Sequence, residues 1–203
     1  MVHFKLIYFN GRARAEPARL ILAHSGVAWE EQRVTDEEWK KIKPTMPMAQ
    51  LPVLEVDGKQ LAQSMAIARY LAKTHGLAGK DDWECANCDM LVDGIFDLYQ
   101  FARTWYFEKD KEKKDHHWKD LIENKLPPVL ERYEGFLKKN ATGYFVGDGV
   151  TWADLTIADW LDFWGRGTPD LLTKYPELAN FKQRIHDIPN VKKWYETRPH
   201  TEL

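Results

Sequence analysis

Residues 51–62, Leu-Pro-Val-Leu-Glu-Val-Asp-Gly-Lys-Gln-Leu-Ala, decide how the first part of this chain folds. Two short apolar runs flank the dipeptide Asp57-Gly58, which favours a two-residue turn between antiparallel strands. We therefore expect a β-hairpin whose strands lie on either side of this dipeptide.

The residues before the hairpin predict a strand, a helix and a second strand. The apolar run over residues 4–9 ends at Asn10-Gly11, as a strand followed by a turn does. Glu16-Pro17 is typical of a helix start, and Gly26 offers a left-handed stop. Residues 29–34 form the second strand candidate. The order strand, helix, strand places these elements ahead of the hairpin.

Two further segments complete this half of the chain. Residues 35–48 form a mixed segment, which has helix-like residues over 36–41 and ends in Pro44 and Pro47, so it is expected to be irregular and partly exposed. After the hairpin, Ser64 can cap a helix that ends at His75-Gly76. The predicted order is βαβ, a loop, ββ and α.

Beyond residues 77–81 the strand signals stop and helical patterns follow. We expect an α/β domain over residues 1–76, a linker over 77–81 and an all-helical domain over 82–203. Pro127-Pro128 implies a kink, and Thr151-Trp-Ala-Asp154 resembles a capping box with a role in folding. The helices are expected at about 82–107, 115–139, 152–165, 175–187 and 190–196.

Composition excludes several classes of function. The 203 residues are 44% hydrophobic with a net charge of −2, so the chain is globular and has no general attraction to nucleic acid or an anionic membrane. Residues 1–80 carry 12 basic and 8 acidic side chains, while the remainder is acidic. No apolar stretch approaches a membrane span, and two cysteines indicate a reducing compartment. We expect a cytoplasmic protein.

Three sequence features bear on a possible metal or redox site. Cys85-Ala-Asn-Cys88 has the spacing of a redox pair but lies on a predicted helix rather than at the first strand-to-helix turn. No second cysteine or histidine pair lies at zinc-finger spacing. Asp89, Asp93 and Asp97 recur every fourth residue on one helix face, where a bound cation or, for Asp89 and Asp93, a solvated acidic surface would account for them. No metal is predicted.

The sequence resembles the cytosolic glutathione S-transferases, most closely their sigma-like class, which includes haematopoietic prostaglandin D synthase and many invertebrate enzymes. This resemblance implies a thioredoxin-like N-terminal domain, an all-helical C-terminal domain, a homodimer, and glutathione as co-substrate for conjugation to a hydrophobic electrophile. The matching positions run from end to end: Tyr8-Phe-Asn10, Arg12-Ala-Arg-Ala-Glu16, Trp39, Lys43, residues 51–58, Gln63-Ser64, residues 66–71, residues 151–154 and Arg198-Pro199.

The resemblance gives Tyr8 and Arg14 the catalytic roles. A thiol of pKa about 8.5 is only a few per cent ionised at neutral pH, and the thiolate is the nucleophile. The Tyr8 hydroxyl can donate a hydrogen bond that prefers the charged sulfur, and the Arg14 cation favours the same form. Ala13 stands where the family usually has glycine, which bears on how the loop presents Arg14.

The remaining glutathione contacts are also implied by the resemblance. Gln63 and Ser64 would bind the γ-glutamyl carboxylate at a helix N-terminus. Trp39 and Lys43 would bind the glycine carboxylate, although a core tryptophan and a solvated lysine are the plainer readings. The segment Ala49, Gln50, Leu51 and Pro52, with a cis bond before Pro52, would pair with the cysteinyl part of glutathione, and Asp97 would reach the glutathione of the partner subunit.

The hydrophobic substrate is not readable from the sequence. Glutathione-dependent isomerisation of the prostaglandin type is an alternative reaction, and a lipophile or haem carrier or a crystallin-like protein is a non-enzymatic alternative. Aromatic and apolar residues at helical spacing also commonly belong to the hydrophobic core rather than to a substrate pocket. By position, the candidates for the substrate pocket are Phe9, Tyr99, Tyr106, Thr156, Trp160 and Leu203.

Overall fold

The computed structural model describes residues 2–201 and divides the chain into two compact units. The first unit comprises the chain up to Ala78 together with the segment from His186 onward. The second unit comprises Gly79–Ile185. The chain therefore passes into the second unit after Ala78 and returns to the first unit at His186.

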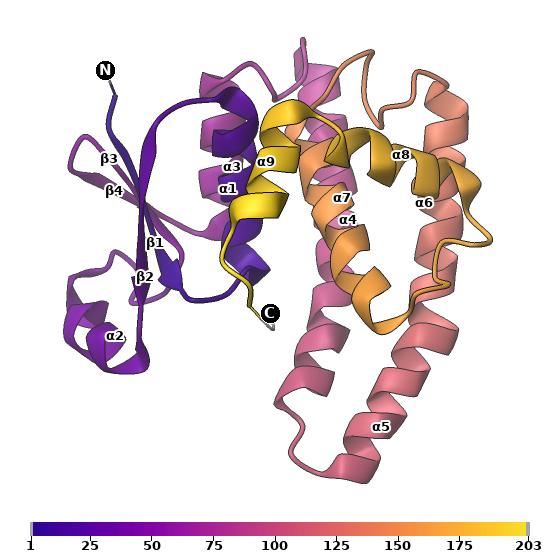
Figure 1. The fold of residues 1–203 in the computed structure, drawn as a ribbon, viewed down its shortest axis with the longest axis horizontal. Helices are drawn as coiled ribbons and strands as arrows, with labels where there is room; N and C mark the ends of the chain where they lie inside the picture. Colours follow the sequence, from indigo (N-terminus) through magenta and orange to yellow (C-terminus); the bar gives the residue numbers. More distant parts are fainter. Residues whose placement is uncertain (1, 202–203) are drawn as a thin grey trace. The chain divides into compact units, whose positions relative to one another are not determined.

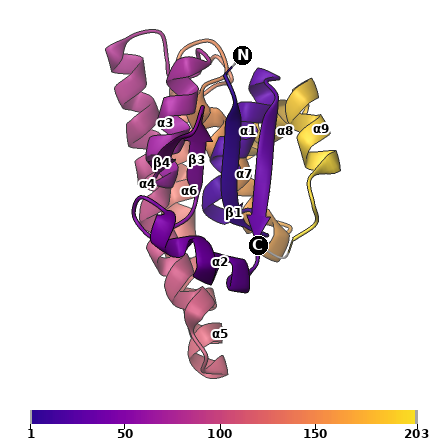
Figure 2. The same cartoon turned by 90° about the vertical axis from the view of Figure 1, so that its left-hand side faces the viewer.

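A four-stranded mixed sheet forms the centre of the first unit, in the order β2-β1-β3-β4 (Figure 2). Its strands are β1 (Phe4–Phe9), β2 (Trp29–Val34), β3 (Val53–Val56) and β4 (Lys59–Ala62). β1 pairs with β2 in parallel and with β3 in antiparallel fashion, and β3 pairs with β4 antiparallel. Asp57 and Gly58 both have positive φ, 48° and 80°, as the predicted hairpin turn requires.

Helices α1 (Glu16–Ser25) and α3 (Ser64–Thr74) cover one face of this sheet (Figures 1 and 2). α1 follows a short 3₁₀ helix, η1 (Ala13–Ala15), has a proline in its first turn, and ends at Gly26 with φ 66°. Leu20, Ile21 and Leu22 are completely buried. Burial of this apolar run holds the residues before α1 close to the end of β1.

The segment over residues 35–48 is more regular than its prolines predict. It contains the helix α2 (Asp36–Ile42) and a 3₁₀ turn, η2 (Lys43–Thr45). The Thr35 hydroxyl accepts from the Glu38 N–H at 3.3 Å, and a Glu38 carboxylate oxygen accepts from the Thr35 N–H at 2.7 Å. This reciprocal capping box starts α2. The helix-like residues over 36–41 therefore form a helix and the segment is largely exposed as expected, whereas its predicted irregularity was wrong.

The last helix, α9 (Pro189–Thr197), packs against α1 in the first unit. Val191 is fully buried, and the rings of Trp29 and Trp194 lie 5.6 Å apart. The sequence pattern alone had grouped this helix with the helical domain. Its contacts join it instead to the unit that contains the sheet.

The second unit consists of helices. These are α4 (Asp82–Phe107), α5 (Lys111–Asp120), α6 (Leu126–Asn140), α7 (Trp152–Gly167) and most of α8 (Pro176–His186). A π-helical turn, η3 (Leu121–Lys125), separates α5 from α6, and a proline occupies the first turn of α6. The single helix expected over 115–139 is therefore interrupted. None of the described helices combines the length and apolar character of a membrane crossing.

The start of α7 confirms the predicted capping box. Asp154 is fully buried, and its Oδ2 accepts from the N–H of Thr151 at 2.8 Å and from the Thr151 hydroxyl at 2.6 Å. Its Oδ1 accepts from the N–H of Phe145 at 2.9 Å. One carboxylate thus caps the helix and anchors the loop that precedes it.

Candidate functional site

Tyr8 lies near the end of β1, where it pairs with Arg33 of β2, one residue beyond the last pair between β1 and β3. Its side chain is 9% exposed, and the ring of Phe9 meets it edge-on with the ring centres 5.7 Å apart. The guanidinium carbon of Arg19 lies over the Tyr8 ring, 5.8 Å from its centre. The phenol is therefore held in a fixed position by the strand and by its neighbours.

Arg14 lies in η1, directly after the turn that ends β1, and its side chain is partly buried. Ala13, the residue that stands in place of the usual glycine, has φ 32° and thus adopts the left-handed region. The loop keeps the glycine-like backbone although it carries a Cβ at this position. The sequence had identified this departure but not its conformation.

Arg19 was not singled out by the sequence. It is completely buried, and its Nη1 donates to the carbonyl of Gly11 at 2.7 Å and to Oε2 of Glu16 at 2.9 Å. Its Nε donates to Oε1 of Glu31 on β2 at 2.6 Å. The sequence did hold a signal for this buried ion pair. Arg19 follows Glu16 by three residues on an otherwise apolar helix face, and an arginine on such a face is usually paired with a carboxylate.

Glu16 is the buried partner of three donors. Oε1 accepts from the indole N–H of Trp194 and from Nη1 of Arg198, each at 2.8 Å, and Oε2 accepts from Arg19. Burial raises the pKa of this carboxyl, but the guanidinium groups of Arg19 and Arg198 and the Trp194 hydrogen bond hold the pKa below its ordinary value. Glu16 is thus a carboxylate that links the start of α1 to α9.

Trp39 and Lys43, expected at the glycine end of glutathione, occupy neighbouring elements. Trp39 lies on α2, and its ring meets the Phe9 ring edge-on with the ring centres 5.8 Å apart. Part of the Trp39 side chain therefore packs on the sheet, as expected of a core tryptophan. Lys43 begins η2 and is exposed to solvent. The Phe9–Trp39 contact fixes α2 next to the end of β1.

The Leu51–Pro52 peptide bond is cis, as the resemblance implied. Ala49, two residues earlier, has φ 47° and again adopts a conformation that favours glycine. Gln50 is exposed, and Leu51 packs with Phe9 and Trp39 against the same buried cluster. The segment before β3 is therefore brought to the same end of the sheet as Tyr8.

Gln63 and Ser64 lie at the start of α3. Ser64 is the first residue of the helix and is 6% exposed, whereas Gln63, with φ 74°, occupies the N-cap position expected for Ser64. Gln63 Nε2 donates to the sulfur of Met48 at 3.1 Å, which connects α3 to the segment before Pro52. The first N–H groups of a helix lack intrahelical acceptors and suit a carboxylate.

The candidates in the helical unit differ in exposure. On α4, Asp97 is exposed, Tyr99 stacks on Phe96 with the ring centres 5.7 Å apart, and Tyr106 is 43% exposed. On α7, Thr156 is buried and its hydroxyl donates to the Trp152 carbonyl at 2.7 Å. The hydroxyl therefore has its hydrogen-bond acceptor within its own helix.

Two of the pocket candidates remain. Trp160 is partly buried and packs beside Tyr133 and Trp164, at 6.3 and 6.4 Å between ring centres. Leu203 lies outside the described residues.

Among residues 2–201, no group of three or more His, Cys, Asp or Glu side chains is arranged to hold a metal ion.

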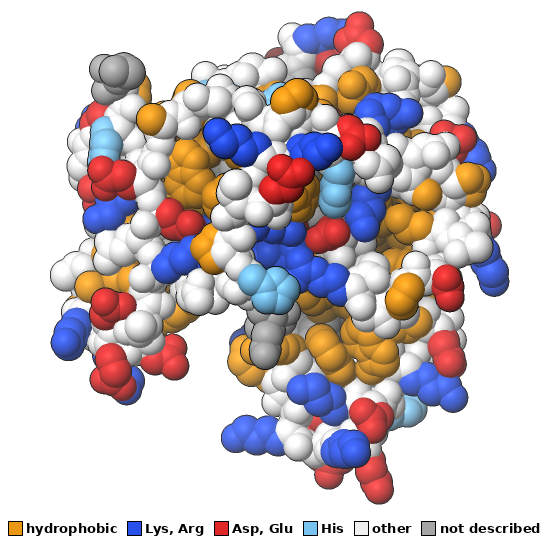
Figure 3. Space-filling view, viewed as in Figure 1, with side chains coloured by type: hydrophobic (Ala, Val, Ile, Leu, Met, Phe, Trp, Pro, Cys, Tyr) orange, Lys and Arg blue, Asp and Glu red, His pale blue; other side chains and the backbone are white. Residues whose placement is uncertain are grey.

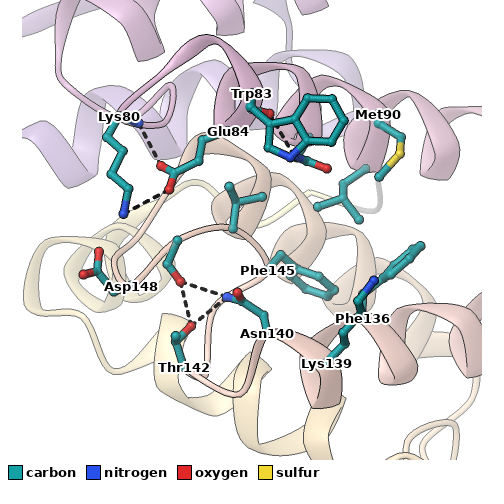
Figure 4. Close-up of a pocket in the computed structure, with 14 residues that line it drawn as sticks. Lys80, Trp83, Glu84, Met90, Phe136, Lys139, Asn140, Thr142, Phe145 and Asp148 are labelled. Atoms are coloured by element: carbon teal, nitrogen blue, oxygen red, sulfur yellow. Dashed lines mark hydrogen bonds and ion pairs between the residues drawn. The ribbon is translucent and has the colours of Figure 1, made fainter.

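A cavity of about 640 Å³ lies within the helical unit, between the first half of α4, the end of α6 and the loop that follows (Figure 4). Glu84 pairs with the Lys80 ammonium at 3.1 Å on one side. On the other side Asn140 Nδ2 donates to Thr142 Oγ1 and to the Gly147 carbonyl, each at 2.8 Å. None of the residues expected to bind glutathione or the second substrate lines this cavity.

The surface carries charges of both signs. On the face shown in Figure 3, Lys and Arg side chains are interspersed with Asp and Glu side chains. This mixture agrees with the net charge of −2. A polyanionic partner is therefore not indicated by the face in view.

Comparisons with known proteins identify the family. Residues 4–73 match the sequence family described as glutathione S-transferase, N-terminal domain, and residues 96–198 match the glutathione S-transferase, C-terminal domain. The chain belongs to the glutathione S-transferases. The expected family, its fold class, its transferase activity and glutathione as co-substrate are confirmed.

Full-length relatives agree with this membership. The transferase is 42% identical to glutathione S-transferase 1 of Ascaris suum over 99% of each chain. It is 38% identical to haematopoietic prostaglandin D synthase of Gallus gallus over 100% of each chain, which agrees with the sigma-like class. A solved structure, described as a monomeric glutathione S-transferase from Necator americanus, is similar with a TM-score of 0.90 and 39% identity, covering 99% of this chain and 100% of that one.

Proposed function

We propose that Tyr8 activates glutathione by donating a hydrogen bond from its hydroxyl to the cysteinyl sulfur as a thiolate. The observation that carries this role is the buried phenol at the end of β1. Lowering a thiol pKa by two units takes about 2.7 kcal/mol. One or two charge-assisted hydrogen bonds, each worth about 1.5–3 kcal/mol, supply that amount. The thiolate then attacks a hydrophobic electrophile.

The glutathione site proposed here collects residues from one end of the sheet. Phe9, Trp39 and Leu51 pack on one cluster, which supports a single site that includes α2, the cis-proline segment and the end of β1. The hydrogen bond from Gln63 to Met48 supports adding the start of α3. The proposed ligands are Tyr8, Arg14, Trp39, Lys43, Ala49, Gln50, Leu51, Pro52, Gln63 and Ser64.

The decisive experiment is an ultraviolet titration of the glutathione thiol bound to the protein, with Tyr8→Phe as the matched variant. We expect a bound pKa well below that of free glutathione and a return close to the free value in Tyr8→Phe, because phenylalanine keeps the ring and removes the donor. A bound pKa that Tyr8→Phe leaves in place would remove Tyr8 from this role.

A homodimer, with Asp97 of one protomer binding the glutathione amine of the other, is part of the same proposal. Exposure of Asp97 supports it, and because one relative is described as monomeric, the mass in solution is the first test. Light scattering at micromolar concentration should give twice the 23.8 kDa chain mass. Asp97→Asn should then raise KM for glutathione and leave this mass unchanged; a monomer would refute both parts.

A prostaglandin-type isomerase is a second candidate, favoured by the 38% identity to the Gallus gallus synthase. The same thiolate would serve, and only the shape of the hydrophobic pocket would differ. Tyr99, Tyr106 and Trp160 remain the proposed pocket residues of the helical unit. Analysis of the products formed from a prostaglandin endoperoxide decides between isomerisation and conjugation.

We also propose a cytoplasmic location, which cell fractionation tests.

A further inference from the structure

The guanidinium of Arg19 is positioned over the face of the Tyr8 ring. Its carbon lies 5.8 Å from the ring centre, within the range in which a cation interacts with an aromatic face. Arg19 is completely buried, so water does not screen its charge. The side chain therefore acts on Tyr8 from within the protein rather than from the glutathione side.

One nitrogen of this guanidinium supports the same arrangement. Nη2 is buried and makes no hydrogen bond with any described residue. Buried N–H groups without an acceptor are rare and need an explanation. An aromatic face is electron-rich and attracts a cation, so the Tyr8 ring offers this unbonded part of the guanidinium a favourable electrostatic contact, although not a hydrogen bond.

Hydrogen bonds through the other two guanidinium nitrogens fix Arg19 in this position. The Gly11 carbonyl and Glu16 bind Nη1, and Glu31 binds Nε. Gly11 belongs to the turn that leads from Tyr8 to Arg14. Arg19 therefore sets both the ring of Tyr8 and the path of the loop that carries Arg14.

The charges around Arg19 come from three elements. Glu16 lies on α1, Glu31 on β2, and Arg198 follows α9 and shares Glu16 with Arg19. Arg33 on β2 also pairs with Glu31, at 3.0 Å, and Arg12 is buried in the preceding loop. Three partnered arginines and two carboxylates therefore meet in this cluster, and Arg19 is the one of these arginines whose guanidinium lies over Tyr8.

We propose that Arg19 is a positioning residue for thiol activation, which holds the Tyr8 ring and makes its hydroxyl a stronger hydrogen-bond donor. The reason is electrostatic, because a cation over the ring stabilises electron density that shifts into the ring as the hydroxyl donates. This inference rests on the role of Tyr8 given under the proposed function.

The first test is Arg19→Lys, measured by the pKa of bound glutathione. Lysine keeps the positive charge that pairs with Glu16 and Glu31. It lacks the planar guanidinium group, so it cannot contact Glu31, the Gly11 carbonyl and the Tyr8 ring at the same time. We expect the pKa of the bound thiol to rise by about half a unit to one unit. The matched control is Arg198→Lys, which disturbs the same Glu16 without lying over Tyr8 and should leave this pKa unchanged.

The second test uses Glu31→Gln, which is isosteric and keeps an acceptor for Arg19 Nε while removing one negative charge. It should lower the pKa of the bound thiol by a few tenths of a unit, opposite to Arg19→Lys. Glu30→Gln is its control, because Glu30 is the adjacent residue on β2 and pairs with His3 instead, at 3.0 Å. A change confined to folding would not produce shifts of opposite sign.

The outcomes separate this inference from the proposed function. If Tyr8→Phe restores the free thiol pKa while Arg19→Lys and Glu31→Gln leave the wild-type value, Arg19 has only a structural role and the inference is wrong. If Tyr8→Phe itself has no effect, the proposed function fails first. If Arg19→Lys does not fold, the sign of the Glu31→Gln shift relative to Glu30→Gln decides alone.

Discussion

The indole N–H of Trp194 donates a 2.8 Å hydrogen bond to Oε1 of Glu16, which lies 178 residues earlier in the chain. Glu16 begins α1 and pairs through its other oxygen with Arg19, the arginine over Tyr8. The end of the chain is therefore connected to the candidate catalytic residue through a single buried carboxylate. Loss of one donor should weaken this connection without leaving the carboxylate unpaired.

Trp194→Phe should lower the free energy of unfolding by about 2 kcal/mol, because it removes one hydrogen bond to a charged group and keeps an aromatic ring beside Trp29. Urea denaturation followed by circular dichroism measures the change. Trp83→Phe is the control, since Trp83 is 77% exposed, and it should change stability by less than about 0.5 kcal/mol. Equal losses in the two variants would contradict the role given to Glu16.

Asp154→Ala should be more damaging, with a loss of about 3 kcal/mol. It removes the acceptor of the buried N–H groups of Phe145 and Thr151, and each unpaired group costs about 1–3 kcal/mol. Asp148→Ala removes an exposed carboxylate from the same loop and should be nearly neutral. Denaturation midpoints of the two variants that coincide would show that the cap does not carry this stability.

His24 should make the transferase less stable on mild acidification. Burial lowers the pKa of His24 below its ordinary value of 6.5, and Nδ1 has no hydrogen-bond partner among the described residues. Between its folded pKa and 6.5, His24 binds more protons in the unfolded chain than in the folded one. Its contribution to the free energy of unfolding is therefore constant above pH 6.5 and falls as the pH decreases through that window.

His24→Gln removes this proton uptake. The loss of unfolding free energy between pH 7 and pH 5.5 should therefore be smaller in His24→Gln than in the wild type. His200→Gln alters an exposed histidine of the same unit and should follow the wild-type curve. The relevant measurement is chemical denaturation at both pH values, and parallel curves for all three proteins would exclude His24 as the source.

The sequence predicted the elements that local signals determine. Asp57-Gly58 specifies its turn through two positive φ values, and α4 occupies the predicted residues 82–107. The residues of α2 were recognised as helix-like, but the segment was expected to be irregular although Thr35 and Glu38 stand at capping-box spacing, because the prolines that follow were given more weight. Local chemistry was sufficient there, and only its interpretation was wrong.

Other features depend on residues far apart and could not be predicted in that way. The contact of α9 with α1 and the bonds of Arg19 to Glu31 join segments whose proximity exists only in the folded chain. The site residues from the family motif fall on elements that share one end of the sheet, such as Phe9 and Trp39. Glu16 was noted only as part of the family match and Arg19 not at all, and the supporting role of both residues was recognised only by their burial and pairing.

Lys43→Ala tests the proposed binding of the glutathione glycine carboxylate. Lys43 is exposed at the start of η2, so the change should not affect folding. Loss of a charge-assisted hydrogen bond of about 1.5 kcal/mol should raise KM for glutathione about tenfold, with kcat nearly unchanged, because the ligand carboxylate is remote from the reacting sulfur.

Lys41→Ala is the matched control, since Lys41 is an exposed lysine of equal charge two residues earlier, on α2. It should alter KM by less than about twofold, as expected of a charge that acts only through solvent. The difference between the two variants should also decrease as salt is added, because screening weakens an exposed ion pair. Equal KM values for Lys43→Ala and Lys41→Ala would assign the effect to net charge and remove Lys43 from the glutathione site.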